Sequence, residues 1–284
     1  MKVGIMFANV LLWGTRDGAE KLAKACEDNG IESVWTVEHV VVPSGYESAY
    51  PYSPSGKMPG DETNPIPDPL AWLAFMAAHT KTVRLATGIL ILPQRNPVIL
   101  AKECATIDVL SEGRLELGIG IGWLKEEFDV IGVPFEERTG RTDEYVGALR
   151  ALWSSDESFA GTFSSFSNAR MFPKPVQDGG IPIVVGGHTK ASARRAGRLG
   201  NGYFPARPQD LGVLLDEMRR AAKDAGRDPD AIEVTTGGPP NIDFAKSLAD
   251  QGVGRIVMPA PTFDPNDADR AFGELSENFI TKVG

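Results

Sequence analysis

Short apolar runs alternate along the chain with segments whose apolar residues recur every three to four positions. The runs have the length and composition of β-strands, and the segments between them have the period of α-helices. The predicted strands are VGIMF (3–7), SVWTV (33–37), VRLATGILI (83–91), RLELGIGI (114–121), IPIVVGG (181–187), NGYFP (201–205), IEVTT (232–236) and GRIVM (254–258). Because strands and helices alternate eight times without a break in composition, the pattern predicts an α/β fold, a (β/α)8 TIM barrel formed as a single domain by residues 1–284.

The main alternative is a doubly wound parallel sheet, which shows the same alternation of strands and helices. Many such sheets have a GxGxxG pattern before the first helix. The first helix here is predicted near residues 18–29 and ends at Gly30, and no such pattern precedes it. Another helix start is marked by Asp68 and Pro69, a capping residue followed by proline. The missing glycine pattern favours the barrel.

Two segments interrupt the alternation and are predicted to be insertions. Residues 40–67 are rich in Pro, Gly, Ser and Tyr, and a connection of this length is uncommon in a compact domain unless it is a lid or is disordered. Residues 155–180 have the pattern of a hairpin placed before the fifth strand. Loops that follow strands lie on the active face of a barrel. We therefore expect residues 45–60 to flank the mouth.

Composition and charge narrow the choice of partner. The chain has 284 residues and a formal net charge of −9, which argues against nucleic acid or an anionic membrane, since both require a basic face. Cys26 and Cys104 lie in helical patterns and lack metal-ligand spacing, so we expect two reduced core thiols and a cytoplasmic protein. A small-molecule substrate is the expected partner.

Polar chemistry is sparse at the predicted strand ends, where a TIM barrel places its active site. Most ends are glycine or apolar, but the second strand ends in Glu38 and His39, and the fifth is followed by His188. No strand ends in a lysine that could form a Schiff base, and no His and Asp cluster has metal-ligand spacing, so no metal is expected. A broad apolar mouth of this kind favours a flat organic cofactor.

The Glu–His pair offers two candidates for catalysis. Neighbouring residues of a strand point to opposite sides, so the two side chains are expected in different surroundings. His39 is the expected proton donor or acceptor, because imidazole titrates near physiological pH. Glu38 is the other candidate, although we expect it to be structural and paired with an arginine. His79, at a helix end, is expected to bind the last carbonyl groups.

Glycine patterns at two strand ends are compatible with a bound ligand. LGIGIGW places Gly118, Gly120 and Gly122 at alternate positions, which indicates close approach either of a ligand or of another part of the barrel. VVGGHTK places Gly186 and Gly187 before the start of a helix. Such a turn either holds a phosphate on free N–H groups or is an ordinary left-handed turn.

Longer strings resemble one known family. They are TGILILPQRNPVILAKECATIDVLSEGRLELGIGIGWLKEEFDVIGVPFEERTGRTDE (87–144), an early WxxEH, PKPVQDGGIPIVVGGHTKASARRAGRLGNGYFP (173–205) and a late GVGRIVM. Together they resemble the bacterial luciferase-like flavin and deazaflavin oxidoreductases over nearly the whole chain. The string GxGxGW-x3-EF-x3-G-x-PF-x2-R is the most specific part. Within that superfamily the chain is most similar to the branch that uses coenzyme F420, a 5-deazaflavin with a phosphate-bearing tail.

The resemblance implies where such a cofactor would lie. It implies a TIM barrel with the tricyclic ring over the strand ends and a non-prolyl cis peptide behind the ring, between Gly88 and Ile89. It also implies that the phosphate site is formed by Gly186 and Gly187 and extends to His188.

The resemblance also maps the acidic–His pair of the family onto Glu38 and His39. Many relatives have Asp before the His, whereas this chain has Glu. Trp123 stands where some deazaflavin dehydrogenases for sugar phosphates have Glu, which argues against a sugar-phosphate substrate. Trp123, Gly120 and Gly122 are further candidates for contact with the cofactor.

We therefore expect a coenzyme F420-dependent oxidoreductase that transfers a hydride between the cofactor and a small organic substrate. The alternatives are a monooxygenase of the same fold that uses FMN and a non-catalytic cofactor-binding barrel. We also expect a homodimer. Substrate contacts are expected from residues 40–67, 123–128 and 155–180, because function varies in loops while the barrel is retained.

Overall fold

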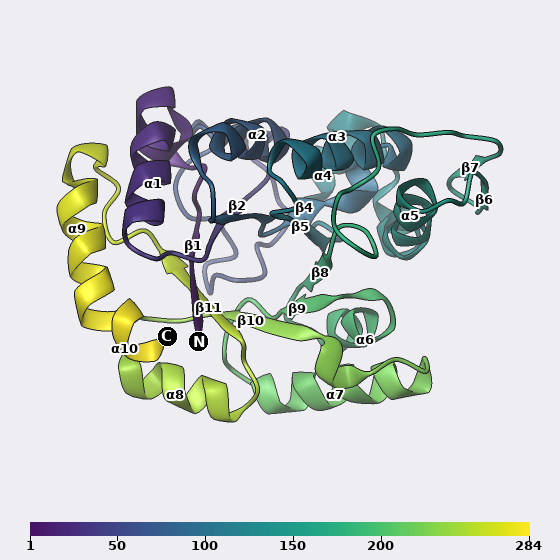
Figure 1. The fold of residues 1–284 in the computed structure, drawn as a ribbon. Coiled ribbons are helices and arrows are strands. Elements are labelled where there is room, and N and C mark those ends of the chain that lie inside the picture. Colours follow the sequence, from purple (N-terminus) through teal and green to yellow (C-terminus); the bar gives the residue numbers. More distant parts are fainter.

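The computed structural model describes residues 1–284 and shows a closed barrel of eight parallel strands surrounded by helices (Figure 1). The strands are β1 (Lys2–Met6), β2 (Ser33–Thr36), β3 (Arg84–Thr87) continued by β4 (Leu90–Ile91), β5 (Leu115–Gly120), β8 (Ile183–Gly186), β9 (Gly202–Phe204), β10 (Glu233–Gly237) and β11 (Arg255–Pro259). The barrel closes because β1 pairs with β2 and β11 while β3 pairs with β2 and β5. The predicted TIM barrel is confirmed, and the doubly wound alternative is wrong.

Helices cover the outside of the barrel. They are α1 (Arg16–Asp28), α2 (Pro69–His79), α3 (Pro97–Leu110), α4 (Lys125–Ile131), α5 (Arg138–Trp153), α6 (Lys190–Leu199), α7 (Leu211–Asp224), α8 (Ile242–Asp250), α9 (Ala268–Leu275) and α10 (Thr281–Val283). Their ends follow from the sequence. Asp68 accepts the N–H groups of Leu70 and Ala71 at 2.9 Å, and Gly30 takes a φ of +72° after α1.

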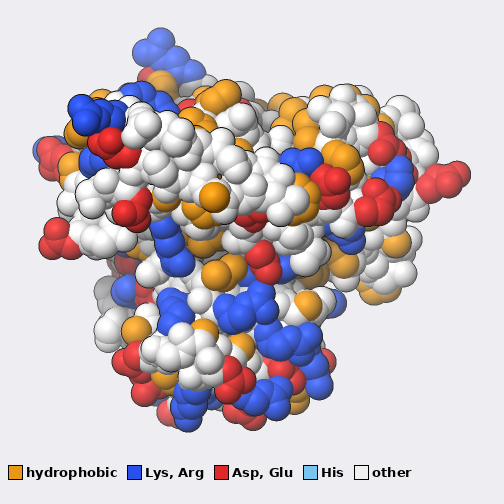
Figure 2. Space-filling view, turned by 90° about the vertical axis from the view of Figure 1, so that its right-hand side faces the viewer, with side chains coloured by type: hydrophobic (Ala, Val, Ile, Leu, Met, Phe, Trp, Pro, Cys, Tyr) orange, Lys and Arg blue, Asp and Glu red, His pale blue; other side chains and the backbone are white.

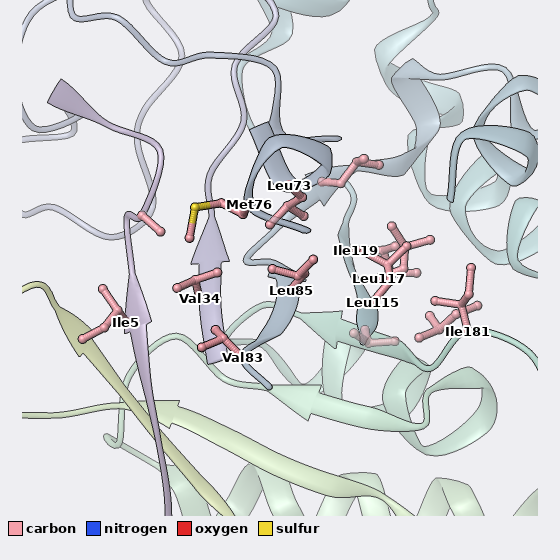
Figure 3. Close-up of a cluster of buried hydrophobic side chains, with 14 of the residues drawn as sticks. Ile5, Val34, Leu73, Met76, Val83, Leu85, Leu115, Leu117, Ile119 and Ile181 are labelled. Carbon is pink, nitrogen blue, oxygen red and sulfur yellow. The ribbon is translucent and has the colours of Figure 1, made fainter. Parts of the chain in front are cut away.

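Hydrophobic side chains form two layers. Figure 3 shows part of the outer layer, in which Val34 of β2 lies near Leu73 and Met76 of α2. A smaller cluster fills the inside of the barrel and consists of Trp35, Ala86, Val184, Phe204 and Val257. Val34 and Trp35 are neighbours on β2 and belong to different layers, as the alternation of a strand requires. Trp35 therefore serves packing inside the barrel.

The third barrel strand differs from its sequence prediction. The run over 83–91 was expected to be continuous, but β3 and β4 are separated at Gly88 and Ile89, whose peptide bond is cis as the resemblance implies. Both pieces pair with β5, so they act as one barrel strand.

Other sequence predictions concern the insertions and the cysteines. Residues 40–67 contain no helix or strand. Residues 155–180 contain an antiparallel hairpin of β6 (Phe159–Ala160) and β7 (Ser165–Phe166), as expected. Cys26 and Cys104 are both buried and free. None of the helices is long and apolar enough to cross a membrane.

Candidate active site

Glu38 is buried and anchors the end of β2. Its carboxylate accepts the Ile91 N–H at 2.5 Å and two N–H groups of Arg95. Arg95 also donates to Asp68 at 2.7 Å. Burial raises the pKa of the Glu38 carboxyl, and the Arg95 guanidinium and the Ile91 N–H offset part of this effect. The expected arginine partner is therefore present, and Glu38 ties β2 to the segment after β4.

His39 faces a different carboxylate. Its Nδ1 lies 3.1 Å from Oε2 of Glu127 on α4, whose side chain is fully buried. Because an ionised carboxylate can only accept, Nδ1 carries the proton and Nε2 is left as an acceptor. Glu127 also accepts the N–H groups of Val40 at 2.6 Å and Val41 at 3.2 Å. One buried carboxylate thus fixes both the imidazole and the start of the first insertion.

Aromatic side chains gather beside His39. Trp123, which follows β5, lies edge-on to His39 with ring centroids 5.7 Å apart. Its ring also lies 5.6 Å from Tyr46 and 5.1 Å from Tyr50, and Tyr50 lies 5.5 Å from Tyr52. The three tyrosines belong to the first insertion. The contacts of Tyr46 and Tyr50 with Trp123, at a strand end, confirm that this insertion flanks the mouth.

The first insertion is anchored on α4 by two successive carboxylates. Glu127 holds its first residues, and Glu126 accepts the N–H groups of Glu47 at 2.7 Å and Ser48 at 3.0 Å. The Ser48 hydroxyl in turn accepts the N–H of Lys125 at 3.1 Å. The segment therefore has a defined path across α4 although it contains no helix or strand.

Packing within the barrel explains the glycines of LGIGIGW. A Cβ at Gly118 would overlap the carbonyl of Thr87, and a Cβ at Gly120 would overlap the side chain of Ile89. Gly122 takes a φ of +81°, a conformation that favours glycine. The sequence left open whether a ligand or the barrel approaches these positions. In the structure the third barrel strand approaches Gly118 and Gly120.

An apolar layer lies beneath the bulge between β3 and β4. Gly88 and Ile89 are both partly exposed. A Cβ at Gly88 would lie 3.1 Å from the Trp35 ring and 3.4 Å from the Phe204 ring, and these two rings pack edge to face with centroids 5.3 Å apart. Because aromatic rings fill the barrel below, the exposed surface of the bulge is the part that a ligand could contact.

The turn after β8 is suited to an anion. Gly187 takes a φ of +122°, and Thr189 caps α6 by accepting the Ser192 N–H at 3.1 Å. Lys and Arg side chains gather on the lower part of the face in Figure 2, over α6 and α7, but Arg194, Arg195 and Arg198 of α6 pair with Glu217 and Asp143. The helix dipole and the first-turn N–H groups favour negative charge at this position.

His188 adjoins this turn. Its Nδ1 is buried and has no hydrogen-bond partner. Burial and the nearby Arg207 lower the pKa of His188, and Asp210 opposes this shift. The imidazole is therefore neutral near pH 7, with an unsatisfied ring nitrogen. The Tyr203 hydroxyl donates to the Gly187 carbonyl at 3.2 Å and holds the turn beside it.

Buried polar atoms without partners are confined to one end of the barrel. They belong to Gln94, Glu126, Arg138 and His188. Each residue follows the C-terminal end of a strand: Gln94 follows β4, Glu126 and Arg138 follow β5, and His188 follows β8. Since buried polar groups are normally hydrogen-bonded, a ligand or solvent must supply the missing contacts at this end.

Two contacts at the candidate site were not assigned from the sequence. Glu127 is the Glu of the GxGxGW-x3-EF string, so the sequence did carry a signal, but it lies 88 residues from His39 and only the fold shows the contact. Arg207 has no motif, and its place near His188 depends on the loop after β9.

His79 binds the Phe75 carbonyl through Nδ1 at 2.9 Å, as expected for a helix end.

Comparison with known sequences gives a family. A family model described as luciferase-like monooxygenase matches residues 1–272. An uncharacterized protein of Mycobacterium tuberculosis is 32% identical over 273 residues, which cover 92% of this chain and 94% of that protein. An F420-dependent glucose-6-phosphate dehydrogenase of Amycolatopsis mediterranei is 31% identical over 229 residues, which cover 79% of this chain and 63% of that protein.

Solved structures agree with the fold. The monooxygenase RslO1 from Streptomyces bottropensis superposes with a TM-score of 0.76 at 25% identity and covers all of both chains. An F420-dependent secondary alcohol dehydrogenase, solved in complex with an F420-acetone adduct, gives a TM-score of 0.77 at 20% identity and covers 100% of this chain and 99% of that chain. At this identity the second structure shows similarity of fold alone.

Proposed function

Because the chain belongs to the luciferase-like monooxygenase family, we propose that it is an oxidoreductase that uses coenzyme F420 to transfer a hydride to or from a small organic molecule. The observation that carries the proposal is the contact between His39 and Glu127, which leaves Nε2 of a mouth histidine free to exchange a proton. The relative from Amycolatopsis mediterranei is described as F420-dependent and supports this choice of cofactor.

The residues at the mouth fit a flat cofactor with an anionic tail. The partly exposed bulge at Gly88 and Ile89 would contact the ring, because aromatic packing closes the barrel beneath it. The turn at Gly187 and the unsatisfied Nδ1 of His188 would hold a phosphate, with Arg207 close enough to lower the pKa of that imidazole. A turn that precedes a helix suits an anion, because its N–H groups and the helix dipole favour negative charge.

In the proposed reaction, residues of this chain accept a proton from the substrate or donate one to it. F420, when bound, supplies a ring carbon that accepts or donates the hydride. Nε2 of His39 takes a proton from a substrate hydroxyl during oxidation, or returns one to the substrate during reduction. Glu127 keeps the proton on Nδ1 and stabilises the charged imidazolium through the 3.1 Å contact. Glu38 takes no part in proton transfer, because its carboxylate accepts hydrogen bonds from Arg95 and from the Ile91 N–H.

An FMN-dependent monooxygenase is the second candidate. It is favoured by the match to RslO1, a monooxygenase by description, which covers both chains completely at 25% identity. The two candidates differ in oxygen chemistry, because the carbon at position 5 of a deazaflavin removes the ready reaction with oxygen.

Titration of the protein with F420 and with FMN, followed by calorimetry, tests the choice between them. We expect F420 to bind more tightly. His188→Ala and Arg207→Ala should each weaken F420 binding by about tenfold, the usual effect of losing one charge-assisted contact. Arg270→Ala, an exposed residue of α9, is the matched control and should change nothing. Equal or tighter binding of FMN would favour the second candidate, and binding of F420 without turnover of alcohols, imines or enones would indicate a non-catalytic barrel.

A further inference from the structure

The first insertion crosses the mouth from one side of the barrel to the other. It leaves the end of β2, and its tyrosines contact Trp123 after β5. Farther on, the guanidinium of Arg207, after β9, lies 5.8 Å from the centroid of the Tyr52 ring. In the closed sheet β9 is four strands from β2 in either direction, so the two strands are opposite each other. Residues 46–52 therefore pass over the mouth.

Aromatic rings line this crossing. Trp123 lies 5.1 Å from Tyr50, which lies 5.5 Å from Tyr52, and the near end of the series is 5.7 Å from His39. All three contacts are T-shaped, an arrangement that fixes the orientation of each ring. Trp123, Tyr50 and Tyr52 nevertheless remain partly exposed. We call these three residues the aromatic row.

The surroundings of the aromatic row disfavour negative charge. Burial and the neighbouring tyrosines raise the pKa of the Tyr50 hydroxyl, and burial raises the pKa of Tyr52, while Arg207 offsets part of both shifts. Away from Arg207, the same weakly polar environment penalises an anionic group of a ligand beside Trp123 and Tyr50. Lys57 lies over the Tyr46 ring, but its ammonium group donates a hydrogen bond to the Tyr46 carbonyl at 2.7 Å.

We propose that the aromatic row is the substrate-binding wall and that it selects flat, uncharged, unsaturated molecules such as conjugated aldehydes and ketones. Planar conjugated molecules stack on aromatic rings and need no charged partner there. A sugar phosphate would bring a dianion against rings in a weakly polar environment, so it is disfavoured. The inference rests on the proposed function, because it takes His39, at the near end of the row, as the proton partner of the bound molecule.

Ligand binding can be measured without any turnover. Four of the five tryptophans, Trp13, Trp35, Trp72 and Trp153, are buried, so a change in emission reports on Trp123. The protein, with its preferred cofactor bound, is titrated with trans-cinnamaldehyde, with 3-cyclohexylpropanal and with glucose 6-phosphate. Calorimetry gives the affinities and tryptophan emission gives the location. We expect cinnamaldehyde to bind at least tenfold more tightly than the saturated aldehyde and to change the emission.

Variants show whether the aromatic row itself causes the tighter binding of cinnamaldehyde. Tyr50→Ala should weaken cinnamaldehyde binding at least fivefold, and Tyr50→Phe should retain it, because the ring and not the hydroxyl makes the contact. Glu62→Gln is a matched control in the same insertion, since the amide keeps an acceptor for the Gly45 N–H. Circular dichroism checks that each variant is folded.

The outcomes separate this inference from the proposed function. The proposal that the aromatic row is the substrate-binding wall would be overturned by any of three results. These are equal affinity for the saturated aldehyde, tighter binding of glucose 6-phosphate, and unchanged binding of cinnamaldehyde by Tyr50→Ala. Selective binding of cinnamaldehyde without any hydride transfer would support the wall and contradict the proposed function. Hydride transfer with a preference for saturated or phosphorylated substrates would support the function and contradict the wall.

Discussion

The two ends of the barrel both contain buried polar side chains, but they differ in how these side chains are paired. At the N-terminal ends of the strands, which we call the base, Arg255 is 1% exposed and donates to Glu32 at 2.7 Å and to Glu116 at 3.1 Å. Arg84 also pairs with Glu116. At the mouth, by contrast, four residues keep buried polar atoms without a partner.

This difference indicates that the base serves the stability of the barrel and that the mouth serves ligand binding. A cavity of about 280 Å³ lies at the base, but its basic residues Lys2, Arg84 and Arg255 face the acidic Glu116 and Glu233. Lys2 and Arg255 also pair with Glu32, so three basic residues meet three carboxylates and the charges neutralise one another. Unsatisfied polar atoms occur instead at the strand ends where TIM barrels place their chemistry. The pairing of the polar groups thus distinguishes the mouth from the cavity at the base.

The largest expected effect is on turnover at the mouth. His39→Ala should lower turnover by about 10²–10⁴, the usual contribution of general acid–base catalysis. Cofactor affinity should stay within a few fold, since the proposed phosphate and ring contacts lie on other strands. Steady-state kinetics with calorimetry measures both.

Two outcomes would contradict this role of His39. Near-normal turnover would remove it from the mechanism. A parallel loss of stability, binding and turnover would identify a packed structural residue instead. Glu38→Gln, measured beside it, should mainly reduce stability, because it weakens the pair with Arg95.

At the base the expected effect is on stability alone. Arg255→Met should lower the free energy of unfolding by about 3–5 kcal/mol, because it leaves Glu32 and Glu116 without their shared partner. Urea unfolding measures this. Lys2→Met is the control, and since its side chain is 47% exposed its pair with Glu233 should be worth less than about 1 kcal/mol. Lost turnover in folded Arg255→Met would show that the base is not purely structural.

The sequence predicted the barrel well because its signals are local. Apolar runs, capping residues such as Asp68 and glycine stops are read within a few positions, and the arginine partner of Glu38 follows from the cost of burying a charge. The glycines at 118 and 120 stayed ambiguous, since only the path of the third strand shows what approaches them.

The parts that the sequence missed all depend on distant contacts. His39 meets Glu127 across 88 residues. The contact between Tyr50 and Trp123 depends on the path of an insertion with no helix or strand, and that between Tyr52 and Arg207 depends also on the loop after β9. None of these pairs leaves a spacing pattern in the chain.

Glu127 is the buried partner that orients His39 at the mouth. Glu127→Gln should lower turnover by about tenfold to a hundredfold, as loss of an orienting partner commonly does. Cofactor affinity should change little, and Glu127→Asp should restore part of the rate. Nitrogen chemical shifts of the His39 ring should show proton density moving away from Nδ1. Glu126→Gln is the matched control, because Glu126 binds Glu47 and Ser48 but not His39. Equal losses in both variants would indicate only a disturbed insertion.

The smallest expected effect is on the free energy of unfolding at low pH, and it arises at the base of the barrel. Burial of Glu27 disfavours its charged form, but hydrogen bonds from the N–H groups of Thr82 and Val83, the Thr82 hydroxyl and the Lys81 N–H lower its pKa from 4.5 to about 2. A pKa lowered by folding stabilises the protein above the unfolded value, and that stability is lost as the pH falls from about 4.5 to about 2.

Glu27→Gln should therefore reduce the free energy of unfolding at pH 7, by less than about 1 kcal/mol because the carboxylate is partly exposed and solvent screens its charge. The difference from the parent protein should shrink as the pH is lowered through 4 and 3, since Glu27 is then protonated in the unfolded state while it stays largely ionised in the folded state. Urea unfolding at pH 7, 4 and 3 measures it. Glu20→Gln on the same helix, whose carboxylate pairs with the exposed Arg16, is the control and should show a smaller difference at every pH. A difference for Glu27→Gln that is the same at pH 7 and pH 3 would mean that packing, and not the ionised carboxylate, links α1 to the start of β3 at the base.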